Sequence, residues 1–296
     1  MSLKTHIRDG TKIGNFLKSI VILPTLDDLP SLKSPIVKHS DKRYSLIGRA
    51  FDNLIRMIIS KKEKIPFEVK TARGVINKHH KKFRKKNCDS ECCCSICKHK
   101  QLFDNLIIIN DKAIEGNLLE EMCKNSLAFS RLEMTIWGGE WNENWASSFN
   151  DDKDVQELIK LYELWNKSFV FPNGKIQLNP TFRFGLLVSG ADADLIVGNN
   201  LFDWKVVYKP RGNLRKMLAQ QVGYILLSIL QNEKVTTSSL YFARYGVTYT
   251  VPIEQLINIE VKEALNKFKQ LTYFDEYLKD RRKWIKVYLP ITRIEK

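Results

Sequence analysis

Two short apolar runs joined by a turn sequence constrain the fold of this chain more than any other feature. Residues 191–197 and 201–207 are rich in apolar side chains and have strand character, and Gly198, Asn199 and Asn200 separate them. Glycine and asparagine favour tight turns because they tolerate backbone conformations with positive φ. The sequence therefore predicts a β-hairpin in this stretch.

The length of the loop decides which side chains share a face of this hairpin. With a two-residue loop, Asp194 lies directly opposite Asp203. Alternation along each strand adds Lys205 and Asp192 to that face, although Asp192 is expected to have a solvent-facing or turn role. A three-residue loop would move Asp194 to the other face unless a bulge corrected it. The opposite face is apolar, is expected to pack against helices, and consists of Ala193, Leu195, Val197, Phe202, Trp204 and Val206.

The two carboxylates and the lysine of the polar face suggest metal chemistry. Crowded carboxylates repel one another, and a hard cation with oxygen ligands, such as Mg²⁺ or Mn²⁺, neutralises them. Such an ion polarises a phosphate and lowers the pKa of bound water. On this interpretation Asp194 and Asp203 hold the metal and Lys205 assists the attacking water. The alternative is a solvated strand face with an ion pair, since Asp-x-Lys is common by chance.

An amphipathic run follows the hairpin. Asn213 is a predicted N-cap for a helix over residues 214–231, where apolar residues recur with the helical period. Gln220 and Tyr224 are four residues apart and share a helix face with Lys216, one turn earlier. These three side chains are expected to reach the metal site or the phosphate backbone. In the alternative interpretation, Gln220 and Tyr224 cover an edge of the hydrophobic core.

The ordered combination of these residues resembles the PD-(D/E)XK nuclease superfamily, specifically its RecB-like branch. The pattern of that branch is Asp, then (Asp/Glu)-x-Lys, then Gln-x-x-x-Tyr. Residues 190–196, 203–205 and 220–224 are similar to these three elements in this order. Residues 240–246 resemble the strand that usually comes next, so the resemblance covers residues 179–256, about a quarter of the chain.

The resemblance implies a fold and an activity. The implied fold is an α/β restriction-endonuclease-like core, a mixed central sheet flanked by helices, here with a largely helical N-terminal half and a basic, cysteine-rich insertion. The implied activity is metal-dependent hydrolysis of phosphodiester bonds, in DNA rather than RNA. Because fold does not fix function, a catalytically silent nucleic-acid-binding subunit and a protein-interaction scaffold are the alternatives. The implied catalytic residues are Asp194, Asp203, Lys205, Gln220 and Tyr224.

A weaker similarity lies near the N-terminus, where residues 47–56 are predicted to be helical. In the RecB-like branch a similar early helix carries a glycine and then a histidine that binds the metal. Gly48 is present here, but Asp52 stands where the histidine is expected. Because aspartate supplies an oxygen ligand, Asp52 is the candidate for the remaining metal ligand.

Composition and periodicity divide the chain into five expected segments. These are a poorly periodic lead-in (1–43) with a short element at 13–23, an early helix (44–64), an irregular basic insertion (65–110), a helical region (111–178) and the nuclease core with a C-terminal helix (179–296). Further helices are expected over residues 116–135, 154–169 and 253–270.

Cysteine usage is uneven, because five of the six cysteines lie between residues 88 and 97. In a cytosolic protein such clustering indicates metal binding rather than disulfide bonds. A loop with free thiols is the alternative, since the usual second cysteine pair is missing. No iron-sulfur cluster is expected, because RecB-like enzymes that carry one place three cysteines after the Gln-x-x-x-Tyr helix. The candidate Zn²⁺ ligands are Cys88, Cys92, Cys94, Cys97 and His99, with His79 or His80 as further candidates.

The charge of the chain indicates a polyanionic partner. Forty-eight Lys and Arg residues against 33 Asp and Glu residues give a net charge of +15, which favours nucleic acid through steering and counterion release. A solvated charged loop is the alternative interpretation of the most basic stretch. No apolar run reaches membrane-spanning length, so a cytoplasmic protein without a membrane partner is expected. The candidate backbone contacts in the insertion are Lys81, Lys82, Arg84, Lys85 and Lys86.

Overall fold

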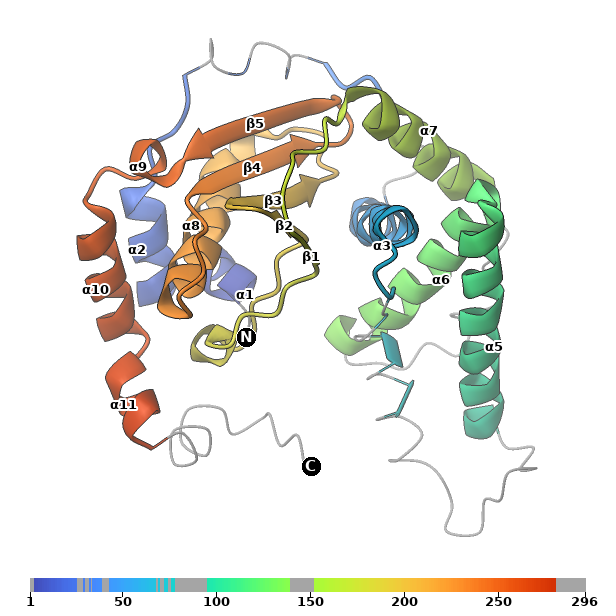
Figure 1. Cartoon of the computed structure of the whole chain (residues 1–296), viewed down its shortest axis with the longest axis horizontal. Helices are drawn as coiled ribbons and strands as arrows, with labels where there is room; N and C mark the ends of the chain where they lie inside the picture. The colour runs from blue at the N-terminus through green and yellow to red at the C-terminus, as the bar shows by residue number, and fades with distance from the viewer. Residues whose placement is uncertain are drawn as a thin grey trace.

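The computed structural model shows a central sheet with helices on both of its sides (Figure 1). It describes residues 3–25, 43–67, 95–138 and 152–280, together with shorter pieces between residues 29 and 38 and between residues 69 and 77. The chain is therefore an α/β protein in which helices flank a central sheet.

Five strands of the described residues form one mixed sheet in the order β1-β2-β3-β4-β5. The pair β3 and β4 is parallel and the other neighbouring pairs are antiparallel. A parallel pair needs a crossover connection, which helix α8 supplies between β3 and β4. The strands are β1 (Ile176–Leu178), β2 (Leu195–Val197), β3 (Asn200–Lys205), β4 (Thr237–Phe242) and β5 (Val247–Pro252).

The predicted hairpin is the pair β2 and β3. Leu195 pairs with Phe202 and Val197 pairs with Asn200, so Gly198 and Asn199 form a two-residue loop. Gly198 has a φ of 59°, a conformation that glycine adopts without steric cost. The register that places Asp194 and Asp203 opposite each other is therefore confirmed, although both strands are shorter than predicted.

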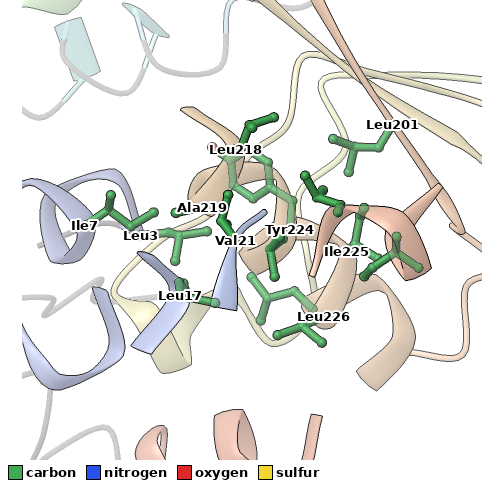
Figure 2. Packing of buried hydrophobic residues seen from close by; sticks show 14 of the residues in the cluster. Leu3, Ile7, Leu17, Val21, Leu201, Leu218, Ala219, Tyr224, Ile225 and Leu226 are labelled. Atoms are coloured by element: carbon green, nitrogen blue, oxygen red, sulfur yellow. The ribbon is translucent and has the colours of Figure 1, made fainter. Parts of the chain in front are cut away.

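Helix α8 (Leu214–Leu230) covers one face of the sheet, and α1 (Leu3–Arg8) and α2 (Lys12–Ile20) pack on α8 (Figure 2). The predicted helix and its predicted N-cap residue are both confirmed. Asn213 occupies the N-cap position without a side-chain capping bond to any described residue, because a 3₁₀ turn (Arg211–Asn213) leads into the helix. The element predicted at residues 13–23 is α2.

The other face of the sheet packs against a group of helices from the N-terminal half. This helical group consists of α3 (Tyr44–Glu63), α5 (Ser95–Gly116), α6 (Leu119–Gly138) and α7 (Asp152–Ser168). The predicted apolar face of the hairpin lies here, except that Ala193 packs with the α8 side. The polar face was predicted to carry chemistry alone, but α8 buries its Ile196 and Leu201. The candidate site residues are therefore confined to one end of that face.

Several predicted boundaries differ from the structure. Residues 95–110 belong to α5 rather than to an irregular insertion, because Phe103, Leu106 and Ala113 form a buried face with helical spacing. The helix expected from residue 116 begins at Leu119 as α6, since Asn117 adopts a φ of 58° and ends α5. The helices expected at 44–64 and 154–169 are α3 and α7.

The C-terminal helix expected over residues 253–270 is interrupted. It forms α9 (Ile253–Leu256) and α10 (Val261–Leu271), and α11 (Phe274–Lys279) follows. The interruption occurs because Ile257 is extended and forms a β-bridge with Val21. Within the described part of the chain, none of the helices combines the length and the apolar character that spanning a bilayer requires.

Candidate active site

Asp194 and Asp203 meet at the carboxyl end of β3. The Oδ2 atom of Asp194 accepts a hydrogen bond of 2.6 Å from the backbone N–H of Trp204, the residue that follows Asp203. The Trp204 side chain points to the opposite face, where its ring packs edge-on against Phe169 at 5.1 Å between centroids. The packing of Trp204 on one face of the sheet therefore holds the backbone segment that positions the Asp194 and Asp203 carboxylates on the other face.

Lys205 connects these acids to helix α8. Its ammonium group contacts the Oδ2 atom of Asp203 and donates a hydrogen bond of 3.1 Å to the Oε1 atom of Gln220. The Nε2 atom of Gln220 donates in turn to the Tyr224 hydroxyl at 2.6 Å. The structure therefore links Asp203, Lys205, Gln220 and Tyr224 through polar contacts, and Asp194 is bonded to the backbone next to Asp203. Lys216, one turn earlier on α8, is exposed to solvent.

Burial and like charge raise pKa values in this cluster. Asp203 is buried, with 4% of its surface exposed, and Asp194 is half-buried. Burial, followed by the charges of Asp203 and Asp52, holds the pKa of Asp194 well above its ordinary range, and the charge of Lys205 opposes this shift only in part. Burial and the charge of Asp203 likewise raise the pKa of Tyr224, so its hydroxyl keeps its proton at neutral pH.

Helix α3 adds Asp52 to the surroundings of the two acids. A Cβ atom at Gly48 would lie 4.0 Å from the Cβ atom of Val206, so α3 runs past the end of β3. The Oδ2 atom of Asp52 pairs with the guanidinium of Arg56 at 2.8 Å, while its buried Oδ1 atom has no hydrogen-bond partner among the described residues. Burial raises the pKa of Asp52, an effect that Arg56 opposes and Asp203 reinforces.

The donor atoms of the site are oxygens, which suit a hard cation. In the described ranges, no group of three or more His, Cys, Asp or Glu side chains is arranged to hold a metal ion. Mg²⁺ is usually bound by one or two carboxylates, waters and substrate phosphates rather than by an all-protein cage. Asp194 and Asp203 fit this two-carboxylate kind of site, and Asp52 contributes a negative charge that Arg56 balances.

Three charged residues near the site were missed in the sequence. The charge of Lys205 is the largest cause that lowers the pKa of Lys4 on α1, so the two ammonium groups lie within each other's field. Glu133 on α6 is buried and lies 4.0 Å from the guanidinium of Arg49 on α3. Of these three residues, only Arg49 could have been found from the sequence, because it begins a row of polar residues with helical spacing along α3. No local sequence pattern indicates that Lys4 or Glu133 lies near the site.

Other predicted residues do not join this cluster or fall on parts of the chain that the structure leaves undescribed. Asp192 is exposed, as expected. The side chain of His99 is half-buried on α5, and of Cys97 only the helical backbone of α5 is described. The candidates outside the described residues are Cys88, Cys92, Cys94, His79, His80, Lys81, Lys82, Arg84, Lys85 and Lys86.

The fold and the site define an α/β protein with a buried cluster of acids, a lysine and an amide at the end of a parallel strand pair. No protein-family model, no curated protein and no solved structure matches this chain. Any conclusion on its function therefore depends on the chemistry of its own side chains.

Proposed function

We propose that the protein is a metal-dependent nuclease that hydrolyses phosphodiester bonds of DNA. The observation that carries this proposal is the convergence of Asp194, Asp203 and Lys205 at the end of β3, with Gln220 and Tyr224 bonded behind them. A carboxylate whose pKa burial raises, as it does for Asp194, is typical of a catalytic site when it lies beside a lysine. The net charge of +15 supports a polyanionic substrate, and such a substrate fits a cytoplasmic protein.

The order of the elements supports the same proposal. The acids lie on a hairpin, a crossing helix carries Gln220 and Tyr224, and a parallel strand follows. This is the arrangement implied by the resemblance to the RecB-like branch of the PD-(D/E)XK nucleases. On this proposal Asp52 of α3 replaces the histidine of that branch, and its negative charge acts on Asp194.

The side chains of the site have distinct roles in the proposed reaction. Asp194 and Asp203 would hold Mg²⁺ or Mn²⁺, and a bound ion of this kind supplies a Lewis acid and a water with a lowered pKa. Lys205 orients the attacking water and stabilises negative charge that develops on the phosphate. Gln220 donates to Tyr224 through its nitrogen, which turns its oxygen toward Lys205 and keeps the ammonium group in place.

Cleavage of labelled DNA by the purified protein tests the proposal. We expect cleavage with Mg²⁺ or Mn²⁺ and none with EDTA. Asp203→Asn and Lys205→Met should each lower the rate by about 100-fold or more, because each removes a group that acts on the reacting phosphate. Asp192→Asn is the matched control, since this carboxylate is exposed on the same segment, and its rate should stay within about twofold.

The outcome of these variants separates the proposal from its alternatives. Circular dichroism and the melting temperature establish that each variant is folded. Cleavage by folded Asp203→Asn at the wild-type rate would show that the activity comes from another site or a contaminant. Metal-independent cleavage would exclude the proposed role of the acid pair.

A catalytically silent nucleic-acid-binding subunit is the second candidate. The specific observation in its favour is that Asp203 and Asp52 already have cationic partners within the chain, Lys205 and Arg56. Such pairing stabilises buried acids without any metal. DNA binding that weakens with salt, without cleavage under any divalent cation, would support this candidate.

A further inference from the structure

A basic groove lies between α7 and the N-terminal segment at residues 36–38. Its volume is about 490 Å³, which is within the range of sites that bind ligands. The apolar part of its lining includes the buried Val37 and the half-buried Leu164. Its charged side chains are exposed, with three lysines against one carboxylate, and are Lys38, Lys160, Glu163 and Lys167.

Arg244 holds both walls of this basic groove in place. Its guanidinium pairs with Glu157 of α7 at 2.5 Å and donates to the Val37 carbonyl at 3.2 Å. Its own carbonyl accepts from the backbone N–H groups of Ile36 and Val37 at 2.8 and 3.1 Å. The walls are therefore fixed before a ligand arrives, which spares binding the cost of ordering them.

The lysines of the basic groove are available to a ligand. None of Lys38, Lys160 and Lys167 forms an ion pair or a hydrogen bond with another residue that the structure describes. Glu163 lies about one helical turn from both Lys160 and Lys167 on α7 and pairs with neither. Three such ammonium groups beside a single carboxylate attract a polyanion.

The spacing of the lysines favours an extended polyanion over a small one. Lys160 and Lys167 are seven residues apart on α7, so their Cα atoms lie about 10 Å apart along the helix axis. A DNA strand carries one phosphate per about 3.4 Å of helix axis. The two lysines are therefore suited to different phosphates of one strand.

The basic groove lies at the same end of the sheet as the candidate active site. The backbone N–H of Ala243, the residue before Arg244, donates to the Lys205 carbonyl at 3.0 Å. Arg244 in turn accepts from Val37, so the Cα atoms of Lys205 and Val37 are separated by about 15 Å at most. A DNA segment of about five nucleotides spans this distance.

We propose that the basic groove binds the backbone of the DNA substrate away from the reacting phosphate, with Lys38, Lys160 and Lys167 as the phosphate contacts. This inference rests on the proposed function and deepens it. Ammonium groups act on phosphates as point charges, so the contact is independent of base sequence. The aliphatic side chains of Val37 and Leu164 suit the deoxyribose carbons between the phosphates.

DNA binding measured separately from cleavage tests the basic groove. The probe is a fluorescein-labelled DNA duplex, titrated by fluorescence anisotropy in EDTA at several salt concentrations. The double variant Lys160→Ala/Lys167→Ala should raise Kd about tenfold or more and lower the slope of log Kd against log salt by about two, because two phosphate contacts are lost. Lys160→Arg/Lys167→Arg keeps both charges and should stay within about threefold of the wild-type Kd.

The matched control is Lys262→Ala/Lys267→Ala, which removes two positive charges from the exposed surface of α10, on the opposite side of the molecule from α7 (Figure 1). Its Kd should stay within about twofold of the wild-type value. Equal Kd values and salt slopes for the two alanine double variants would overturn the inference, because the effect would then be one of net charge alone.

Glu163→Gln should act in the opposite direction. It removes the one carboxylate of the basic groove, so Kd for the duplex should fall by about two- to threefold. Glu263→Gln, at an exposed position of α10, removes the same charge elsewhere and should leave Kd unchanged. An equal gain in both variants would count against a local contact with phosphates.

A small polyphosphate is the other occupant that these measurements distinguish. Inorganic triphosphate, titrated by calorimetry, serves as the probe. Triphosphate binding that Lys160→Ala/Lys167→Ala abolishes, together with an unchanged Kd for the duplex, would overturn the inference and assign the groove to a small anion.

Kinetic measurements separate a failure of this inference from a failure of the proposed function. In a protein that cleaves, Lys160→Ala/Lys167→Ala should raise KM about tenfold. Cleavage with wild-type KM and Kd in this variant would refute the role of the basic groove and leave the nuclease proposal standing. Absence of cleavage by the wild-type protein, together with the tenfold change in Kd, would refute the nuclease proposal and support the groove.

Discussion

At the scale of single residues, Asp194 is a carboxylate in surroundings that disfavour its charged form. Its carboxylate is half-buried beside Asp203 and Asp52, and burial with like charge raises its pKa well above the ordinary range. The charged form is therefore less stable in the folded protein than in the unfolded chain. Such groups are retained where function requires them.

Asp194→Asn should stabilise the folded protein at neutral pH while abolishing cleavage. Asparagine keeps an oxygen to accept the hydrogen bond from the Trp204 backbone and removes the repelled charge. We expect the free energy of unfolding in EDTA to rise by about 1–2 kcal/mol near pH 8. Urea unfolding followed by circular dichroism measures this, and a destabilised Asp194→Asn protein at that pH would contradict it.

The pH dependence of this gain follows from proton binding. Between the pKa of Asp194 in the unfolded chain and its higher value in the folded protein, the folded state binds more protons. The contribution of Asp194 to stability therefore falls as pH rises through that interval. The gain from Asp194→Asn should be small near about pH 4 and larger near about pH 8.

At the scale of elements, close approach at glycine decides how helices pack. A Cβ atom at Gly223 of α8 would lie 2.7 Å from the Cδ2 atom of Leu3, which is fully buried. It would also lie 3.2 Å from Leu17 of α2. A larger residue at position 223 would therefore force Leu3 to move where α1 and α2 meet α8 (Figure 2), although glycine lowers the helix propensity of α8 itself.

The same substitution should have opposite effects at two helical glycines. Gly223→Ala should destabilise the protein by about 1–3 kcal/mol, because the added methyl group overpacks the contact with Leu3. Gly48→Ala has room, with its nearest neighbour 4.0 Å away, and should leave stability unchanged or raise it by about 1 kcal/mol. Thermal unfolding of both variants checks this pair, and a stabilised Gly223→Ala protein would contradict the packing argument.

At the scale of the whole molecule, a buried ion pair joins the sheet to the helical group. Arg244, just beyond β4, is 0% exposed and pairs with Glu157 of α7 at 2.5 Å. Its side chain also donates to the Val37 carbonyl, and its own carbonyl accepts from the backbone N–H groups of Ile36 and Val37. One arginine therefore connects the sheet, α7 and the N-terminal segment.

Breaking this ion pair on one side should be costly. Arg244→Met removes the guanidinium that pairs with the buried Glu157 carboxylate, and we expect a loss of about 3–5 kcal/mol in the free energy of unfolding. Glu157→Met should cost a similar amount. The double variant should lose clearly less than the sum of the two single losses, because both buried charges are then gone. Strictly additive losses in urea unfolding would show that the pair does not act as a unit.

The β2–β3 hairpin, which carries Asp203 and lies next to Asp194, could be predicted from the sequence because its signals are local. The turn at Gly198 and the alternation of apolar and polar residues set the register that aligns Asp194 with Asp203. Helical periodicity located α3, α7 and α8. These properties depend on backbone geometry over a few residues, so they can be predicted from short stretches of sequence.

The tertiary structure alone decided which elements meet at the site. The passage of α3 past the end of β3, the burial of the polar sheet face under α8, and the proximity of Lys4, Arg49 and Glu133 depend on contacts between residues far apart in sequence. Ile257 left the helical conformation because it forms a bridge with Val21. These contacts between distant residues form because together they minimise the apolar surface that the whole chain exposes to water. No local sequence pattern contains that information.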